Sequence, residues 1–565
     1  MYYKLLTKKI LPDERTKVLE YNDFKIYWEG FLFIKGVKPG KESIKTFIDK
    51  IKETPITQLL SFLSGTFGCI VYDKSKDIIY TFSDNKGLFN IFYSTNYIST
   101  SFLESIKLNQ YTKSDIDPIR IADFILTNSC FKWNTFFPNL NKLHYKNVII
   151  DNGKDLKFQE KKLNDIFQIQ NADNNIIKKF KPIVQSLRKM DDKILVDLSS
   201  GFDTRMVNSI LDFYNLDYET GISGTPNCLD VILSKKLAEI IGKKHNIILH
   251  KINGNSLQKE LADSFLHWDG TMDIIKWHRL YQYQKYLVDN DFALNISSMG
   301  GELYKGERFW WFEHGSNRSD IKDLINANLN IRYALHFKNI PHEIFSRKYQ
   351  NYTKSYKERI YNYLEKTYDN DTTGKLKIRI YYEFVECSSI VNLHGNINRY
   401  DILFDRDLLP CGLTLKEVII SINKTNKNVP FIPILIEKYQ LPWGGRRLFE
   451  KKIITYLNKK IARIKTNNIR GKSASSTLYG LIKDYINQLS LSLRRRLDLS
   501  IYFPPSIDQD LYPLVRSLDR THEIIELLQN AEILKSNIKV ESIPNNYLGT
   551  LYTIGKHLKF IESIN

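Results

Sequence analysis

The spacing of apolar and polar positions in the first 160 residues predicts short strands separated by turns. Alternation favours strands at 67–73 and 77–82, joined by a polar turn. Further strands are expected at 88–93 and 146–151, and apolar residues at helical spacing predict a helix over 117–127. This order of elements is typical of an antiparallel-rich α+β domain.

The pattern changes after a polar segment at 168–175, which we predict to be a linker. Short apolar strands then alternate with longer helices, and this implies a parallel, doubly wound sheet whose ligands bind at the carboxyl ends of the strands. Helices dominate from about residue 318 onward. The predicted strands lie at 193–198, 218–222, 246–250 and 291–297, and the predicted helices at 203–213 and 230–241.

Length and composition describe a folded protein of several domains. The 565 residues allow two to four domains at roughly 100–200 residues each. Hydrophobic residues make up 42% and charged residues 26%, which argues against broad disorder. No apolar run approaches the roughly 20 residues of a membrane span, and the first ten residues lack the core of a secretory signal. We therefore expect a soluble cytoplasmic protein with no membrane partner.

Charge and cysteine content exclude further classes. The net charge is +19, but Lys and Arg are spread along the chain, so we expect a solvated basic surface and no dedicated nucleic-acid partner. The five cysteines are an odd, scattered set without CxxC spacing, which favours buried free thiols over disulfides or a zinc site.

The sharpest chemical feature is the run 196–205, Val-Asp-Leu-Ser-Ser-Gly-Phe-Asp-Thr-Arg. A loop of small residues between a buried strand and a helix exposes backbone N–H groups at the positive end of the helix, where phosphate binds well. Asp203 would then hold a metal ion whose charge compensates the phosphates. Ser and Asp near a helix start are also ordinary N-caps, so both interpretations stay open here.

At this loop the chain resembles the asparagine synthase family, whose pyrophosphate loop reads Ser-Gly-Gly-x-Asp-Ser. Ser199, Ser200, Gly201, Asp203 and Thr204 occupy that pattern, with Ser200 in place of the first Gly. The resemblance extends in order and spacing over nearly the whole chain. The other stretches that resemble family motifs are 234–245, 298–306, 403–409 and 441–449.

The resemblance implies a two-part fold. Residues 1–165 would form an Ntn-type, glutamine amidotransferase-like α+β sandwich. Residues 176–565 would form an α/β ATP-pyrophosphatase domain of the Rossmann-like adenine nucleotide α-hydrolase type, with helical additions.

The N-terminal part departs from the family at its reactive position. The stretch 83–93 corresponds to the family's Arg-Asp-Arg-x-Gly-x-Arg-Pro-Leu-Tyr-Tyr and keeps Asp84, Gly87 and Tyr93. Active members begin with a Cys that hydrolyses glutamine, whereas residue 2 here is Tyr2. A phenol cannot replace a thiolate nucleophile, so we expect glutamine hydrolysis to be lost.

The resemblance implies an ATP-dependent carbon–nitrogen ligase with ATP and Mg²⁺ as cofactors. It would adenylate a carboxylate and let an amine displace AMP, as the β-lactam synthetases and lasso-peptide cyclases do without that Cys. Arg446 and Glu302 would be catalytic, and Asp203 and Glu302 would bind Mg²⁺. The residues expected to hold the nucleotide are Leu198, Ser199, Ser200, Gly201, Asp203, Thr204, Gly300 and Gly301.

Three positions leave alternatives open. Aligning Gly300 with the family's second Gly puts Glu302 at a magnesium-binding Asp, whereas an alignment anchored on Glu302 and Leu303 puts Gly301 there. Met299 stands where asparagine-forming members have Glu and β-lactam-forming members have Tyr, and it cannot transfer a proton. Arg446 aligns with a catalytic Lys and keeps its charge, but it is a poor acid or base.

The sequence is therefore compatible with three functions. The leading prediction is an amide-forming synthetase whose partners are a small-molecule or peptide carboxylate and an amine. Its alternatives are an ammonia-dependent asparagine synthase and a catalytically decayed nucleotide-binding scaffold. A homodimer is compatible with each of these functions.

Overall fold

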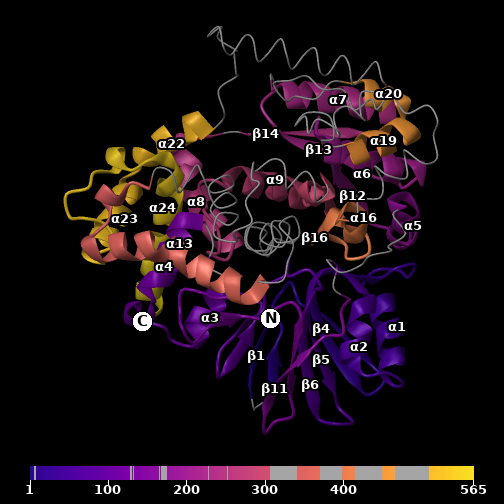
Figure 1. Ribbon diagram of the computed structural model, residues 1–565, viewed down its shortest axis with the longest axis horizontal. Helices are drawn as coiled ribbons and strands as arrows, with labels where there is room; N and C mark the ends of the chain where they lie inside the picture. Colours follow the sequence, from indigo (N-terminus) through magenta and orange to yellow (C-terminus); the bar gives the residue numbers. More distant parts are fainter. Residues whose placement is uncertain are drawn as a thin grey trace.

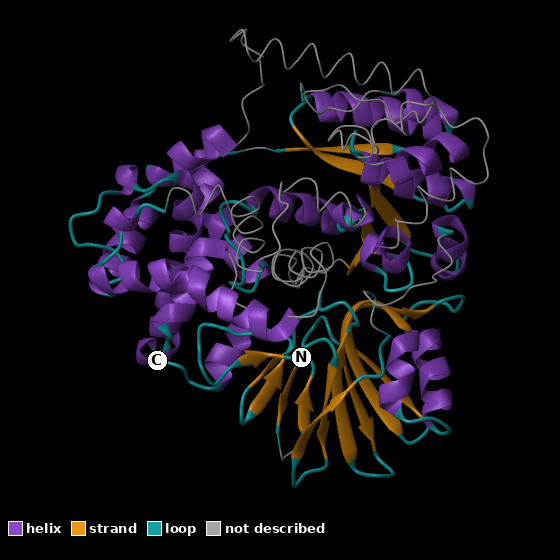
Figure 2. Ribbon diagram, in the orientation of Figure 1, coloured by secondary structure: helices purple, strands orange, loops and turns teal. Residues whose placement is uncertain are grey.

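The computed structural model shows a mixed α/β protein with several sheets, one of them parallel (Figures 1 and 2). The structure describes residues 1–5, 8–127, 130, 133–164, 166, 175–226, 228–250, 252–305, 340–368, 398–413, 448–464 and 508–565.

The N-terminal part consists of two antiparallel sheets. One sheet has the strand order β11-β10-β6-β5-β4-β3 and the other β2-β1-β8-β7-β9. Buried residues of both sheets, among them Tyr3, Ile70 and Ile98, share one apolar cluster, so the sheets pack face to face. The strands are β1 (Tyr2–Lys4), β2 (Lys9–Leu11), β3 (Lys17–Tyr21), β4 (Phe24–Ile34), β5 (Leu63–Asp73), β6 (Ile78–Ser83), β7 (Phe92–Tyr93), β8 (Tyr97–Ser99), β9 (Asn141–Lys142), β10 (Asn147–Asp151) and β11 (Leu156–Glu160).

The outer face of the six-stranded sheet is covered by α1 (Lys41–Ile51) and α2 (Ile56–Leu59). Apolar residues of α1 recur at helical spacing, with Ile44, Phe47 and Ile48 facing the sheet, and they form a second core with residues such as Trp28. Figure 1 shows both helices beside β4 and β5.

The middle of the chain forms a five-stranded parallel sheet in the order β14-β13-β12-β15-β16. Its strands are β12 (Lys193–Asp197), β13 (Glu219–Gly224), β14 (His245–Leu249), β15 (Phe292–Ser297) and β16 (Asn398–Asp401). The strand order reverses direction at β12, between β13 and β15. In open parallel sheets ligands bind outside the carboxyl ends of the strands at such a switch point.

Helices lie on both faces of this sheet (Figure 1). Side chains of one face, including Val196 and Ile296, share a core with α5 (Ile176–Leu187), α6 (Phe202–Phe213) and α7 (Leu229–Ile241). The same core includes α19 (Leu448–Leu457) and α20 (Lys459–Arg463). On the other face, Leu195 packs against α9 (His278–Asp289).

The remaining helices form a separate all-helical layer, drawn on the left of Figure 1. One apolar cluster joins buried residues of the N-terminal part, such as Phe102 and Phe136, to helices at the end of the chain through residues such as Tyr547, so these two parts share a core. The helices of this layer are α3 (Phe102–Leu108), α4 (Pro118–Thr127), α8 (Gly254–His267), α13 (Arg347–Tyr368), α22 (Asp508–Arg516), α23 (Asp519–Asn530) and α24 (Asn545–Ile564). Short 3-10 helices and α16 (Leu409–Leu413) complete the described elements.

Most of the predicted elements up to residue 297 are confirmed within one or two residues, and one strand is shorter than predicted. Within 88–93 only Phe92–Tyr93 forms a strand. At the start of this stretch the N–H groups of Leu88 and Phe89 donate to the carboxylate of Asp84 and are therefore not available to a strand partner. Residues 168–174 of the predicted linker lie outside the described residues. None of the described helices is long and apolar enough to cross a membrane.

Candidate functional site

The predicted phosphate loop lies at the switch point of the parallel sheet. Leu198 follows β12, residues 199–201 form the turn, and α6 begins at Phe202. The middle of the strand, Ile194 to Val196, is apolar because helices cover both of its faces, whereas the loop is built of small residues. Asp203 lies in the first turn of α6, where a carboxylate faces the positive end of the helix.

Hydrogen bonds within the protein fix the shape of this loop. The Ser199 N–H donates to the Thr204 hydroxyl, and the Gly201 N–H donates to the Ser199 hydroxyl, both at 3.1 Å. The Ser200 N–H donates to the Asp230 carboxylate at 2.6 Å. Asp230 is in the first turn of α7, so this bond ties the loop to the helix after β13. The loop is therefore ordered, but its amides already have acceptors.

A second loop, after β15, meets the first. It begins at Ser298 and contains Gly300, whose φ of +90° suits glycine and whose absent Cβ leaves room for Phe404. A Cβ at Gly301 would overlap the carboxyl group of Asp203, so the backbone of the second loop lies against that carboxyl group. Glu302 follows at the start of the 3-10 helix Gly301–Lys305, and its side chain lies outside the described structure.

Arg446, the expected stabiliser of the reacting centre, lies outside the described residues. The helix that follows it, α19, packs against α6. Lys451 on α19 is buried, and its Nζ lies 5.4 Å from the ring centroid of Phe202, the first residue of α6. The structure thus brings a cation to the end of α6 that carries the loop, and no motif in the sequence singled out this lysine.

A buried polar cluster underlies the two loops on the α9 face of the sheet. The Asp197 carboxylate accepts hydrogen bonds from the Tyr283 hydroxyl at 2.5 Å and from the Asn295 amide at 2.8 Å. Arg399 of β16 pairs with Asp401 at 2.8 Å. Sequence reasoning missed this cluster because its members come from four separate segments. The one available signal was an Asp at the end of an otherwise apolar strand.

Arg399 also holds the second loop. Its Nη2 donates to the Ser297 hydroxyl at 3.0 Å and contacts the Met299 sulfur at 2.6 Å. Burial would lower the pKa of Arg399, but the carboxylates of Asp401 and Asp197 outweigh this effect and raise it. The guanidinium is therefore a fixed positive charge beneath Met299.

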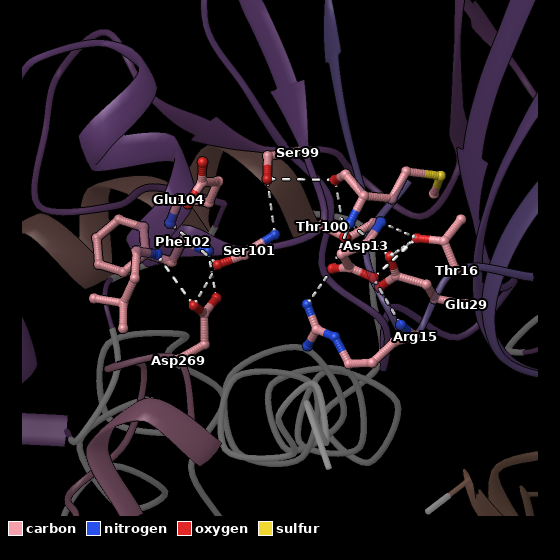
Figure 3. Close-up of polar contacts among 12 residues, drawn as sticks. Asp13, Arg15, Thr16, Glu29, Ser99, Thr100, Ser101, Phe102, Glu104 and Asp269 are labelled. Carbon is pink, nitrogen blue, oxygen red and sulfur yellow. Dashed lines mark hydrogen bonds and ion pairs between the residues drawn. The ribbon is translucent and has the colours of Figure 1, made fainter. Parts of the chain in front are cut away.

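The N-terminal sandwich holds a second polar cluster, around the amino group of Met1 (Figure 3). The α-ammonium group of Met1 donates to Glu29 at 2.7 Å, to Asp13 at 2.8 Å and to Thr100 at 3.0 Å. Met1 is 2% exposed, whereas Tyr2 is only partly buried in β1. Position 2 carries the phenol of Tyr2, and the amino group of Met1 beside it is held in ion pairs with Asp13 and Glu29.

Arg15 and Asp269 lie near the Met1 cluster (Figure 3). Partial burial would raise the pKa of Asp13, but the Met1 ammonium and the Arg15 guanidinium outweigh it and hold this pKa well below its usual range. Asp269, which follows α8, accepts hydrogen bonds from the Ser101 hydroxyl and from the first amides of α3. It therefore caps a helix of the N-terminal part from the middle of the chain.

Strand β16 joins the parallel sheet to the N-terminal sandwich. The ring of Tyr400 packs against Phe31 and Phe33 of β4, with centroids 5.6 and 5.5 Å away. Lys35 forms ion pairs with Asp405 and Asp407 just after the strand. Burial would raise the pKa of Asp405, but nearby lysines, Lys35 foremost, outweigh it and lower this pKa.

Comparisons with known proteins leave the family resemblance as an expectation. No family model matches the chain, and no match is found among curated proteins. Within the described ranges, no group of three or more His, Cys, Asp or Glu side chains is arranged as a metal site.

Proposed function

We propose that the chain is an ATP-dependent synthetase that adenylates a carboxylate and joins it to an amine, releasing AMP and pyrophosphate. One observation carries the proposal: the loop at 199–201 joins a parallel strand to a helix start at the switch point of the sheet. Phosphate groups bind well at such helix starts, because backbone dipoles and N–H groups converge there.

The residues around the loop fit ATP and Mg²⁺. Asp203 supplies a hard oxygen ligand for magnesium, and the hydroxyls of Ser199 and Thr204 lie at the loop. Bound Mg²⁺ would neutralise the phosphates and help pyrophosphate to leave. In this proposal the finer fold is that of an amidotransferase-like sandwich followed by an ATP-pyrophosphatase domain.

The amine in this proposal is free ammonia or an amine of the substrate itself. Tyr2 offers no thiolate, and the ammonium group of Met1 is held in ion pairs. Incubation of the purified protein with glutamine should yield no glutamate. Glutamate formation above a no-enzyme control would contradict this part of the proposal.

A second candidate is a scaffold protein without catalysis whose nucleotide site has decayed, and one specific observation favours it. The N–H groups of Ser199, Ser200 and Gly201 all have acceptors within the protein, one of them the carboxylate of Asp230. A phosphate would have to compete with that carboxylate for the Ser200 N–H.

Exchange of labelled pyrophosphate into ATP separates the two candidates. The purified chain is incubated with ATP, Mg²⁺ and pools of carboxylic acids that include the amino acids. A synthetase gives exchange that requires both Mg²⁺ and one acid. Absence of exchange for any acid would leave the scaffold as the better account.

A further inference from the structure

The polar cluster beneath the two loops stands where a substrate would meet the nucleotide. Val196 pairs with Ile296, and Ser297 pairs with Asp401, so Asp197, Ser297 and Asp401 lie in one row at the carboxyl ends of three adjacent strands. Asp197 is the last residue of β12, two positions before the turn at 199–201. This row is therefore at the ligand-binding edge of the sheet.

Asp197 is anchored through one oxygen and free at the other. Oδ1 accepts both hydrogen bonds, from Tyr283 and Asn295, whereas Oδ2 has no hydrogen-bond partner in the part of the chain that the structure describes. The residue is only half-buried. A carboxylate that is held in place by one oxygen and accessible at the other has the geometry of a general base.

The charges around Asp197 leave room for a cation. Those that face it are the Arg399 guanidinium and the Asp401 carboxylate of β16, together with the neutral Tyr283 of α9. With Asp197 ionised, two carboxylates oppose one guanidinium. Burial raises the pKa of Asp197, and Arg399 counteracts this effect only in part, so the group is a better proton acceptor than an exposed carboxylate.

The neighbouring loop supplies no competing base. Met299 cannot accept a proton, and its sulfur is in contact with Arg399. Ser298 is 7% exposed, and its hydroxyl has no hydrogen-bond partner among the described residues. A buried hydroxyl without a partner costs free energy unless a ligand or water satisfies it, so this loop has an unused polar group beside the cluster.

We propose that Asp197 is the proton acceptor for an amine substrate, which binds as an ammonium ion over the ends of β12, β15 and β16. This inference rests on the proposed synthetase function. Asp197 takes one proton from the ammonium ion. The freed nitrogen lone pair attacks the carbonyl carbon of the acyl adenylate, the C–N bond forms, the bond from that carbon to the phosphate oxygen breaks, and its electron pair leaves with AMP. The second nitrogen proton passes to water.

The test compares two nucleophiles in the full-length protein. Wild type and Asp197→Asn are given ATP, Mg²⁺ and the pool of amino acids, and pyrophosphate exchange reports the first half-reaction. AMP release is then measured with ammonium chloride or with hydroxylamine, which is largely uncharged at neutral pH. The matched control is Asp212→Asn, another carboxylate with a pKa raised by burial, at the far end of α6.

The expected result separates the two nucleophiles. Asp197→Asn should keep pyrophosphate exchange and hydroxylamine-dependent AMP release, while ammonium-dependent release falls about 100-fold or more. Unchanged ammonium-dependent release in a variant that still exchanges pyrophosphate overturns the inference and leaves the synthetase standing. Absence of exchange in wild type overturns both.

Tyr283→Phe gives a second readout, the pH profile. The Tyr283 hydroxyl stabilises the ionised form of Asp197, so its loss should raise the pKa of Asp197 further. Because the base acts in its ionised form, the acid limb of the ammonium-dependent rate should move to higher pH. A limb that stays in place while the overall rate falls would mean that Tyr283 has only a structural role, and it would contradict the assignment of Asp197.

Discussion

The backbone of Gly301 lies against the carboxyl group of Asp203, so the loop after β15 and the first turn of α6 are in direct contact. This contact brings the stretches 196–205 and 298–306 together at the switch point of the sheet. They are 98 positions apart in the chain (301 − 203).

Gly301→Ala should impair binding of ATP with Mg²⁺. The added methyl group would overlap the Asp203 carboxyl group, which would have to turn away from the loop. We expect affinity to fall about tenfold or more, a free-energy change of about 1.4 kcal/mol or more. Isothermal titration calorimetry measures this loss. Gly254→Ala is the control, because a Cβ there meets nothing and its φ is not positive; equal losses in both variants would argue against a specific role of position 301.

Lys35→Met should destabilise the folded protein through the junction at β16. Asp405 is almost fully buried and would lose the closest of its cationic partners. Leaving one partner of a buried pair uncompensated costs about 3 kcal/mol. Urea unfolding should detect this, and the double variant with Asp405→Asn should recover part of it. Lys38→Met removes an exposed pair with Asp191 and should cost under about 1 kcal/mol.

Glu29→Gln should weaken the N-terminal sandwich. The Glu29 carboxylate is buried and accepts hydrogen bonds from the Met1 ammonium and the Thr16 hydroxyl (Figure 3). Replacing a charged acceptor by a neutral one at such a pair should cost about 2 kcal/mol in the free energy of unfolding. The exposed Glu14 serves as control through Glu14→Gln, which should change stability little. An unchanged unfolding midpoint in Glu29→Gln would contradict the ion pair.

The buried carboxyl group of Asp273 should make the free energy of unfolding depend on pH. Burial raises its pKa to about 6, above the value of 3.8 expected in the unfolded chain. The folded state therefore binds the proton more tightly, and its stability falls as pH rises through about 6. Asp273→Asn should be more stable than wild type at neutral pH by about 3 kcal/mol, and this advantage should vanish as pH falls towards 3.8. A pH-independent difference between the two proteins would contradict this prediction.

The sequence predicted those helices and strands that are marked by the spacing of apolar residues within the element itself. Strands β5, β6 and β12 and helices α4, α6 and α7 follow from apolar periodicity. Five of them lie within one or two residues of their expected bounds, and β5 begins four residues earlier than expected. Strand β16 could not be found this way. Its four residues are Asn-Arg-Tyr-Asp, and they form a strand because β15 and the sandwich surround them.

The candidate site was predictable only in part for the same reason. The small-residue loop is a local pattern, and the structure puts it where the pattern predicts. Arg399, Tyr283 and Asp197 meet through the tertiary fold, so no spacing in the sequence relates them. The hydrogen bond between Ser200 and Asp230 likewise joins the loop before α6 to the first turn of α7, which lies 30 residues further along the chain.

We propose that ATP binds with Mg²⁺ at the loop between β12 and α6. Calorimetric titration of ATP into the full-length protein tests it most directly, with and without Mg²⁺. We expect Mg²⁺-dependent binding in wild type and in the control Asp212→Asn, and loss of that binding in Asp203→Ala. Absence of binding in wild type, or equal Mg²⁺-dependent affinity in Asp203→Ala, would contradict it.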